Sequence, residues 1–283
     1  MATVLKGAEV SEALNTKIME ESEALKAMGV NPTLAILRVG ERGDDISYEK
    51  GVTKRAEKVG VAIKNVLLPA DVAQEVLIKA IEDLNADKSV HGVLMFRPLP
   101  DHLDEDVVRN MLEPSKDIDG ITDASMSGVF AGIHTGFAPC TPSACMEILE
   151  HFGVDAKGKH AVVVGRSLVV GKPAAMMLLD RNATVTIAHS RTADLPSVVR
   201  EADIVIACVG RAKMVEASYL KPGQIVIDVG INVLEDGSLS GDVDFEAASS
   251  IVEAITPVPG GVGAVTTSVN LKHVVEAARN QNS

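Results

Sequence analysis

A glycine-containing turn between two regular elements is the clearest place where residue types and spacing could bind a cofactor. Residues 162–173 read VVVGRSLVVGKP, an apolar run followed by a turn and by a proline near the start of a helix. This order is typical of a dinucleotide-binding unit, although the spacing is not the usual G-x-G-x-x-G. We expect Gly165 to close the turn and Gly171 to let the helix pack on the strand, with helix N–H groups facing a pyrophosphate. A tight turn without a ligand is the alternative.

The residues after the next apolar run indicate which dinucleotide would bind. An NAD enzyme often has Asp or Glu there, about 20 residues further on, to bind the ribose 2′-hydroxyl. This sequence has Ser190, Arg191 and Thr192 instead, and Arg166 lies in the first turn. Guanidinium and hydroxyl groups suit a 2′-phosphate, so the pattern favours NADP over NAD. A solvated loop charge is the competing interpretation of Arg191.

Charge and aromatic content exclude several classes of partner. The 27 Lys and Arg against 39 Asp and Glu give a net charge of −12, which argues against nucleic acid and anionic membranes. A small anionic ligand remains compatible, because local arginines and helix N-termini bind phosphate in acidic proteins too. Two Tyr, five Phe and no Trp predict an aliphatic core and are too few for a platform that stacks single-stranded nucleic acid.

The cysteines and histidines lack the spacing of a metal site. Cys140, Cys145 and Cys208 form no C-x-x-C pair, and the seven His show no pair spacing, so we predict no metal. An odd cysteine count argues against a disulfide framework, and reduced thiols predict a cytoplasmic protein. The first residues do not resemble a signal peptide, and no stretch approaches the roughly 18 apolar residues of a membrane span.

Alternating strand and helix patterns must position these residues. In the first half of the chain, short apolar runs predict strands and amphipathic patterns predict helices, the first of which has Ser11 as its N-cap. The expected strands are 33–39, 61–68 and 91–96, and the expected helices are 11–28, 46–58 and 71–85. This alternation is typical of an α/β domain with a parallel sheet.

A second series of the same kind begins near residue 140, after the stretch Pro139–Pro142. We therefore expect a second α/β domain from that point. Its expected strands are 159–164, 183–189, 203–208, 224–229 and 251–255, and its expected helices are 143–152, 173–180 and 266–280.

Six motifs in this order and spacing resemble those of one family, the tetrahydrofolate dehydrogenase/cyclohydrolases. They are SYEKGVTKRAEKVG with Tyr48, RPLP at 97–100, KDIDG at 116–120, PCTP at 139–142, GRSLVVGKP at 165–173 and PVPGGVG at 257–263. The resemblance covers essentially the whole chain. It implies NADP-dependent oxidation of 5,10-methylenetetrahydrofolate to the methenyl form, usually followed by hydrolysis to 10-formyltetrahydrofolate.

The same resemblance implies the domain organisation and the assembly. It predicts a folate-binding catalytic domain from residues 1–139 plus 266–283 and a Rossmann-type, doubly wound NADP-binding domain from residues 140–265, with the active-site cleft between them. It also implies a homodimer. Two competing readings are another NADP oxidoreductase, acting on an amino or keto acid, and a catalytically inactive folate- or NADP-binding regulator. KDIDG together with PVPGGVG disfavours the first, and the presence of the binding residues disfavours the second.

Two positions depart from the family pattern, and both belong to its hydrolytic pair. The family has Tyr-x-x-x-Lys, whose Lys the cyclohydrolase reaction requires, whereas this chain has Val52 four residues after Tyr48. Lys50 and Lys54 lie two positions away, about 200° round a helix, and would point away from that spot. The family's Gln in Gln-Leu-Pro-Leu-Pro is replaced by Phe96.

Val52 and Phe96 would place two apolar side chains, which could pack on each other, where the family has a Lys–Gln pair. Such a pair cannot perform the acid–base steps of hydrolysis, and it tends to exclude water. Hydride transfer needs only the positioning of substrate and nicotinamide, because the cofactor carries the chemistry. We therefore expect a dehydrogenase with weak or absent cyclohydrolase activity. The alternative is a bifunctional enzyme in which Lys54 or another group replaces the missing Lys.

The resemblance also implies the residues that contact the folate. Asp119 would grip the pterin through two parallel hydrogen bonds, with Asp117 in a more structural role, and Tyr48 would stack on the aminobenzoyl group. A loop Asp that caps a turn is the competing reading of Asp119, and a half-buried helix Tyr that of Tyr48. Pro257, Gly260 and Gly261 would allow close backbone approach to pterin and nicotinamide.

The implied cofactor residues lie in three segments of the second half. They are Gly165, Arg166, Ser167, Ser190, Arg191 and Ile231. Nearer the folate motifs, Cys140 is expected to be a packed, inert thiol, because the sequence places no His to activate it. Arg97 replaces an apolar family residue, and it either contacts a substrate carboxylate or lies on the surface.

Overall fold

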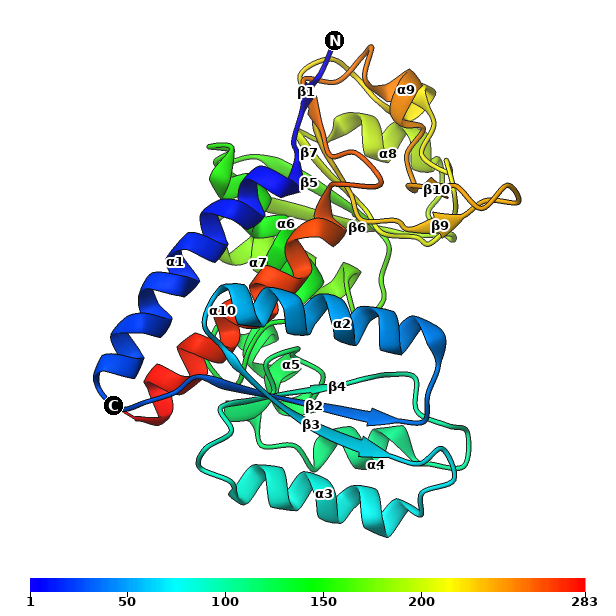
Figure 1. The fold of residues 1–283 in the computed structure, drawn as a ribbon. Coiled ribbons are helices and arrows are strands. Elements are labelled where there is room, and N and C mark those ends of the chain that lie inside the picture. Colours follow the sequence, from blue (N-terminus) through cyan, green and yellow to red (C-terminus); the bar gives the residue numbers. More distant parts are fainter. Residues whose placement is uncertain (283) are drawn as a thin grey trace. The chain divides into compact units, whose positions relative to one another are not determined.

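Short runs of Val, Ile, Leu and Ala form the strands of two parallel sheets, one in each of two units of the chain (Figure 1). The computed structural model describes residues 1–282. One unit contains Ala13–Cys140 and the chain from Thr267 on, and the other contains Met1–Glu12 and Thr141–Thr266. The predicted two-domain α/β class with a parallel sheet is therefore confirmed. None of the helices within residues 1–282 is long and apolar enough to cross a membrane.

The unit that contains Ala13–Cys140 is built on a three-stranded parallel sheet with β2 in the middle. Figure 1 shows α2 on one side of this sheet and α3 on the other. Its strands are β2 (Thr33–Val39), β3 (Ala62–Leu68) and β4 (Gly92–Met95), and its helices are α2 (Gly43–Lys58), α3 (Gln74–Ala86), α4 (Glu105–Asn110), α5 (Asp123–Ala131) and the 3-10 turn η1 (Pro114–Lys116).

The core of this unit is aliphatic, as the scarcity of aromatic residues predicted. Leu77, Ile81 and Leu84 recur at helical spacing on α3 and are buried against side chains of β2 and β4. Pairing of β2 with β4 ends at Leu37 and Met95, and the Phe96 amide then donates to the Leu37 carbonyl at 2.9 Å. Phe96 is therefore held at the carboxyl end of the sheet.

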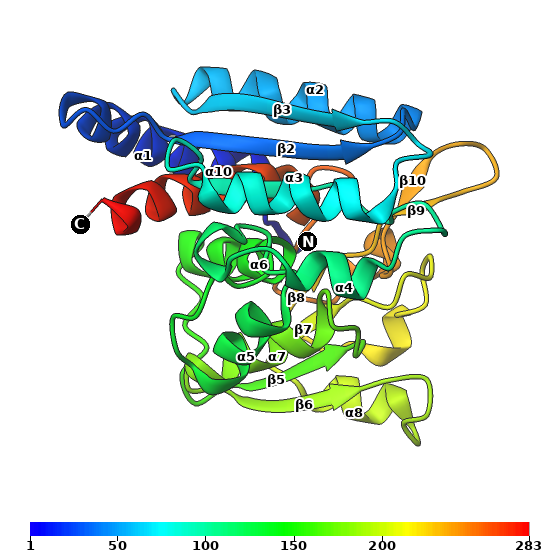
Figure 2. The ribbon, with the colours of Figure 1, turned by 90° about the horizontal axis from the view of Figure 1, so that it is seen from below.

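The other unit has a six-stranded parallel sheet in the order β1-β11-β8-β7-β5-β6. Figure 2 shows β5 and β6 side by side in this sheet. The strands are β1 (Thr3–Val4), β5 (His160–Val164), β6 (Thr184–Ala188), β7 (Ile204–Ala207), β8 (Ile225–Asp228) and β11 (Ala254–Ile255); the remaining elements are α6 (Cys140–His151), α7 (Gly171–Asp180), α8 (Leu195–Glu201), η2 (Ala217–Tyr219), the hairpin of β9 (Asn232–Val233) and β10 (Leu239–Ser240), and α9 (Phe245–Ala248).

The strand order creates a switch point at β5. The chain proceeds from β5 to β6 on one side and then to β7 on the other side of β5. Connections on opposite sides leave a crevice at the carboxyl ends of the strands where the order reverses, which is where such sheets bind ligands. The predicted cofactor turn, which starts at Gly165, leaves β5 at that place.

Two long helices, α1 (Gly7–Ala27) and α10 (Val262–Gln281), contain residues of both units. The prediction that Ser11 caps the first helix is wrong, because the helix begins four residues earlier, at Gly7. Val10 is already on the buried face, and the Ser11 hydroxyl donates to the Ala264 carbonyl at 2.7 Å. Ser11 is therefore an interior helix residue that joins α1 to the start of α10.

The structure also differs from the expected division of the chain. We expected residues 1–139 in the first domain, but Met1–Glu12 group with the other unit. The reason is that β1 pairs with β11, at Thr3 with Ala254 and Val4 with Ile255. A two-residue edge strand has too little apolar periodicity to be recognised from sequence.

Candidate active site

Two buried charged side chains hold the KDIDG segment. The Lys116 ammonium donates to the carbonyl oxygens of Leu84, Asn85 and Asp87, at 2.7, 2.9 and 2.7 Å. The carbonyls at the end of α3 lack partners within the helix, so Lys116 caps its C-terminus. Burial lowers the pKa of Lys116, and the three carbonyl partners offset part of that desolvation.

Asp117 has the structural role that the sequence predicted. Its carboxylate accepts from the amides of Ile121 at 3.0 Å and Thr122 at 2.8 Å and from the Ser125 hydroxyl at 2.6 Å. These bonds close the turn at Gly120, whose φ of 65° and close approach to the Phe137 carbonyl leave no room for a Cβ. The position of Asp119, between these anchored residues, is therefore well defined.

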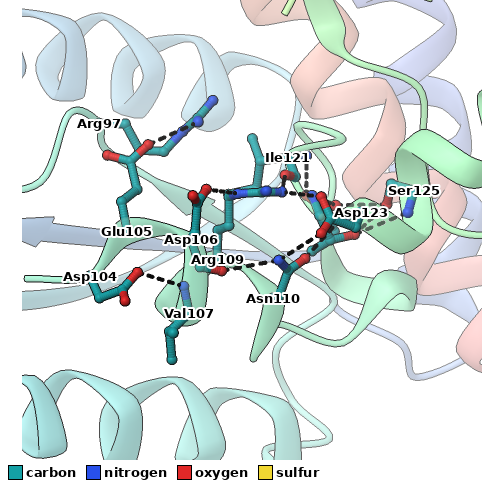
Figure 3. A network of polar contacts seen from close by, with 12 residues as sticks. Arg97, Asp104, Glu105, Asp106, Val107, Arg109, Asn110, Ile121, Asp123 and Ser125 are labelled. Carbon is teal, nitrogen blue, oxygen red and sulfur yellow. Dashed lines mark hydrogen bonds and ion pairs between the residues drawn. The ribbon is translucent and has the colours of Figure 1, made fainter. Parts of the chain in front are cut away.

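A second polar network holds the segment that follows KDIDG (Figure 3). Arg109 on α4 donates to Asp106 at 3.0 Å, to the Ile121 carbonyl at 2.8 Å and to Asp123 at 2.7 Å. Asn110 and Asp123 pair reciprocally, through the Asn110 amide group at 3.0 Å and the Asp123 backbone amide at 2.9 Å. The network fastens α4 to the start of α5.

Arg97 lies in an ion pair, also visible in Figure 3. Its Nη1 is 3.2 Å from Glu105 Oε1, and the other Glu105 oxygen accepts from the Leu99 amide at 3.0 Å. The pair fixes the RPLP turn. Arg97 is partly exposed, and its positive charge also lowers the pKa of Asp119. Arg97 is thus an ion-paired residue whose positive charge also acts on Asp119, the carboxylate predicted to bind the pterin.

The carboxyl group of Asp119 is desolvated, although part of the residue is exposed. Burial raises the pKa of Asp119 to about 6, and a hydrogen bond from the Cys140 thiol opposes the shift. A thiol is a weak donor. The carboxylate therefore retains the capacity to accept strong N–H donors from a ligand.

Tyr48 combines an accessible ring with an anchored hydroxyl. Its α2 helix is joined to β2 by the buried ion pair of Arg38 and Glu49, whose Nε–Oε2 distance is 2.7 Å. The residue is 41% exposed, and its ring centroid lies 5.5 Å from that of Phe96 at a tilt of 46°. The hydroxyl accepts from Asn270 Nδ2 at 3.3 Å, and burial of that end raises the pKa of Tyr48 to about 12.

Both positions of the expected hydrolytic pair are apolar and removed from water. Val52 on α2 is 0% exposed, and Phe96 after β4 is 7% exposed. Lys50 and Lys54, which flank Val52 in sequence, are exposed on the helix. The helical register thus turns these two lysines outward while Val52 faces the interior, as the sequence predicted.

Cys140 is packed against groups that the sequence did not bring together. Its Sγ lies 3.2 Å from the Ile118 carbonyl and 3.6 Å from His273 Nδ1. That nitrogen is 2.8 Å from the same carbonyl, which can only accept, so Nδ1 carries a proton and cannot take one from the thiol. Burial raises the pKa of Cys140 well above its usual range. The prediction of an inert thiol agrees with this geometry, although His273 was missed.

In the other unit, the PVPGGVG loop lines a pocket of about 260 Å³. The structure brings together Ile231, which follows β8, and Pro257, Gly260 and Gly261, which follow β11. Gly260 has a φ of 98°, and a Cβ on Gly261 would lie 2.4 Å from the Pro257 carbonyl oxygen. The loop therefore requires these glycines, and it lies at strand ends where open α/β sheets bind ligands.

The glycines of the dinucleotide turn have the roles that the sequence predicted. Gly165 has a φ of 138°, and a Cβ there would lie 2.4 Å from the Cys208 carbonyl oxygen at the end of β7. A Cβ on Gly171 would lie 2.4 Å from the Gly165 carbonyl oxygen, so glycine allows α7 to approach β5 closely. The Ser167 hydroxyl accepts from the Val170 amide at 3.1 Å and so caps the turn before α7.

Arg166, Ser190 and Arg191 are exposed beyond the carboxyl ends of the adjacent strands β5 and β6. Ser190 and Arg191 lie in a tight turn. The His189 amide donates to Thr192 Oγ1 at 2.9 Å, and the Arg191 amide donates to His189 Nδ1 at 3.1 Å. Hydroxyl and guanidinium donors at this strand edge fit the phosphates of a dinucleotide cofactor.

Two buried aspartates in this unit were not predicted from the sequence. Asp228, at the end of β8, accepts from the amides of Gly230, Asp242 and Val243, and burial raises its pKa to about 6. Asp242 accepts from three consecutive amides, those of Val209, Gly210 and Arg211. Together they fasten the loops after β7 and β8. The sequence signal for Asp228 is that it ends an apolar strand run; Asp242 lies in a loop after β10 and has no such signal.

Two family models match the chain. The catalytic domain of the tetrahydrofolate dehydrogenase/cyclohydrolases matches residues 5–119, and their NAD(P)-binding domain matches residues 139–282. The chain is 50% identical over 283 residues to the bifunctional protein FolD of Alkaliphilus oremlandii, covering 100% of this chain and 99% of that protein.

Solved structures are similar over the same length. The bifunctional FolD methylenetetrahydrofolate dehydrogenase/cyclohydrolase of Campylobacter jejuni is 38% identical, with a TM-score of 0.96 over 99% of each chain. The methylenetetrahydrofolate dehydrogenase-cyclohydrolase of Trypanosoma brucei, solved with NADP and an inhibitor, is 35% identical, with a TM-score of 0.91 over 99% of this chain and 98% of that one.

Proposed function

We propose that this chain, which belongs to the tetrahydrofolate dehydrogenase/cyclohydrolase family, oxidises 5,10-methylenetetrahydrofolate to the methenyl form with NADP and hydrolyses that product weakly or not at all. The chain is an oxidoreductase with an NAD(P)-binding domain. The observation that carries the second half of the proposal is the burial of Val52 and Phe96, at 0% and 7% exposure.

In the oxidation, a C–H bond of the methylene carbon breaks and its hydride passes to the nicotinamide, which leaves the methenyl cation. The cofactor supplies the electron acceptor, and the residues of the chain bind and orient. We assign the pterin to Asp119, whose carboxylate can accept two parallel N–H donors, and the aminobenzoyl group to the exposed ring face of Tyr48. Pro257, Gly260 and Gly261 are assigned to close backbone contacts at the reacting end.

Hydrolysis of the methenyl product makes a different demand, because water must attack and protons must move while the ring opens. The contacts at the Tyr48 hydroxyl are an amide and a hydroxyl, from Asn270 and Thr267, and the ring beside it is Phe96. None of these three is an acid or base near neutral pH. The relatives are named bifunctional. The apolar Val52 and Phe96 are the reason to propose that this chain keeps the dehydrogenase activity but has little or no cyclohydrolase activity.

A single progress curve that follows NADPH and methenyltetrahydrofolate together tests this proposal. We expect the methenyl product to accumulate in step with NADPH and to decay at the rate seen without enzyme. An acceleration of that decay that disappears in Asp119→Asn would contradict the proposal. Lys54→Met decides the bifunctional alternative, since loss of hydrolysis in Lys54→Met but not in Lys50→Met would identify Lys54 as the replacement.

The preference for NADP over NAD is a separate part of the proposal. Three exposed donors, Arg166, Ser190 and Arg191, lie beyond adjacent strand ends, which supports recognition of a 2′-phosphate. A relative solved with NADP supports the same assignment.

Arg191→Ala tests the preference. We expect the KM for NADP to rise about ten-fold, because one charge-assisted hydrogen bond is lost, while the KM for NAD changes little. Arg181→Ala is the matched control. Arg181 is an exposed arginine at the C-terminal end of α7, whereas the predicted cofactor turn leads into its N-terminal end. Equal effects of Arg191→Ala on both cofactors would overturn the assignment of the 2′-phosphate.

The pH dependence tests the assignment of Asp119. Its pKa of about 6 predicts that kcat/KM for the folate falls as the pH drops below about 6, because the protonated carboxyl loses an acceptor site. Asp119→Asn should abolish this acid limb and raise the folate KM, whereas Asp101→Asn, at an exposed position, should change neither. Persistence of the same limb in Asp119→Asn would contradict the assignment. The free energy of unfolding depends on pH in the opposite direction. Because folding raises the pKa of Asp119 to about 6, its contribution to stability is present at low pH and is lost as the pH rises towards about 6.

We also propose a homodimer in the cytoplasm. The strand β6 forms an open edge of its sheet, with Ile187 exposed, and such an edge can pair with a second copy. The three free cysteines favour a reducing compartment. Sedimentation equilibrium should give twice the chain mass of 29.7 kDa, and a single species at that chain mass would refute the dimer. Cell fractionation tests the location.

A further inference from the structure

We propose that Asn270 is a positioning residue that couples the hydroxyl of Tyr48 to the thiol beside Asp119. The inference rests on the proposed function, because it concerns how the two folate contacts are held. Asn270 does not touch the folate in this proposal. It acts through the groups that do.

The place of Asn270 on α10 suits this task. It is 1% exposed and lies three residues after Thr267 and three before His273, so the three polar side chains share one side of the helix. Thr267 also hydrogen-bonds the Tyr48 hydroxyl. His273 stacks on Phe137 with centroids 4.9 Å apart. The buried side of α10 thus faces the Tyr48 hydroxyl at one turn and the Cys140 thiol at the next.

The carboxamide of Asn270 bridges two groups of different character. Its Nδ2 donates to the Tyr48 hydroxyl at 3.3 Å, and its Oδ1 accepts from the Cys140 thiol. An asparagine side chain carries a donor NH2 and an acceptor oxygen in one plane, on either side of Cγ, whereas a carboxylate only accepts and a hydroxyl has a single oxygen for both roles. Both ends of the amide are therefore satisfied in a buried place where an unpaired end would be unfavourable.

The thiol extends the bridge to the predicted pterin contact. Cys140 also contacts the carboxyl group of Asp119 and lies 3.2 Å from the Ile118 carbonyl, one residue earlier in KDIDG. Its single thiol proton is donated to one of these acceptors at a time, with Asn270 Oδ1 among them. A continuous path thus runs from the Tyr48 hydroxyl through Asn270 and Cys140 to Asp119. The path lies entirely within the unit that contains Ala13–Cys140.

The path has a consequence for binding, because Tyr48 is 41% exposed and would otherwise be free to change rotamer. Anchoring its hydroxyl through α10 holds the ring at a set distance from Asp119. Substrate then meets a preorganised pair of contacts instead of ordering them as it binds. Loss of the anchor should weaken the binding of folate and leave the binding of the nucleotide unchanged.

The test compares Asn270→Leu, which keeps size and removes both hydrogen bonds, with the wild type. We expect the KM for 5,10-methylenetetrahydrofolate and the calorimetric Kd for tetrahydrofolate to rise about five-fold, the equivalent of about 1 kcal/mol for one neutral hydrogen bond. The KM for NADP and kcat should stay within two-fold. Asn282→Leu, at the exposed end of the same segment, is the control and should change none of these.

A double variant separates positioning from general packing. In the Tyr48→Phe background the hydroxyl is already absent, so Asn270→Leu should add less than two-fold to the folate KM. If Asn270→Leu raises the KM as much there as in the wild type, or raises the KM for NADP in parallel, Asn270 has only a packing role and the inference fails.

Cys140 supplies an independent check should Asn270→Leu fold poorly. Cys140→Ser keeps a donor for the amide and should retain the folate KM, whereas Cys140→Ala should raise it. Equal KM values for Cys140→Ser and Cys140→Ala would overturn the inference.

The outcomes also separate this inference from the proposed function. A wild type that binds tetrahydrofolate without reducing NADP would refute the proposed function alone, because the Kd series still tests Asn270. A wild type that does not bind tetrahydrofolate would refute both.

Discussion

Parallel strand pairing is the constraint on which the rest of this structure depends. Every pairing in the two main sheets is parallel, so the carboxyl ends of neighbouring strands meet at one edge and the chain must return by a crossover before it starts the next strand. The segments that leave those ends carry the candidate residues: Phe96 follows β4, Gly165 follows β5, Ser190 follows β6 and Ile231 follows β8.

Buried charges hold the loops that lie near the candidate residues. Lys116 caps a helix while Asp117 closes the adjacent turn, and Asp228 and Asp242 do the same for the loops of the other sheet. Each charge forms three or more hydrogen bonds, which offsets its desolvation. Asp119 differs, because its partner is the weak donor of Cys140. A desolvated carboxylate with unused acceptor capacity is what a ligand with N–H donors requires.

The regular elements could be predicted where apolar runs were long. The strand 33–39 matches β2 in both of its bounds, and Gly165 and Gly171 have the backbone roles that their positions indicated. Elements with short or weak patterns were missed: the two-residue strand β1, the hairpin of β9 and β10, and the helices α4 and α5. Ser11 was misread because a serine inside a helix and a serine at its start look alike in sequence.

The sequence by itself determined the residue types, and with them the chemistry that is possible: an apolar Val52 and Phe96, a carboxylate at Asp119 and arginines suited to phosphate. Only the tertiary structure decided which groups meet. Asn270 is 222 residues from Tyr48 along the chain, and the two hydrogen-bond because α10 packs near α2. His273 reaches Ile118 and Cys140 in the same way. The physical reason is that periodicity reports which face of an element is buried, whereas the partner of that face depends on how distant elements pack.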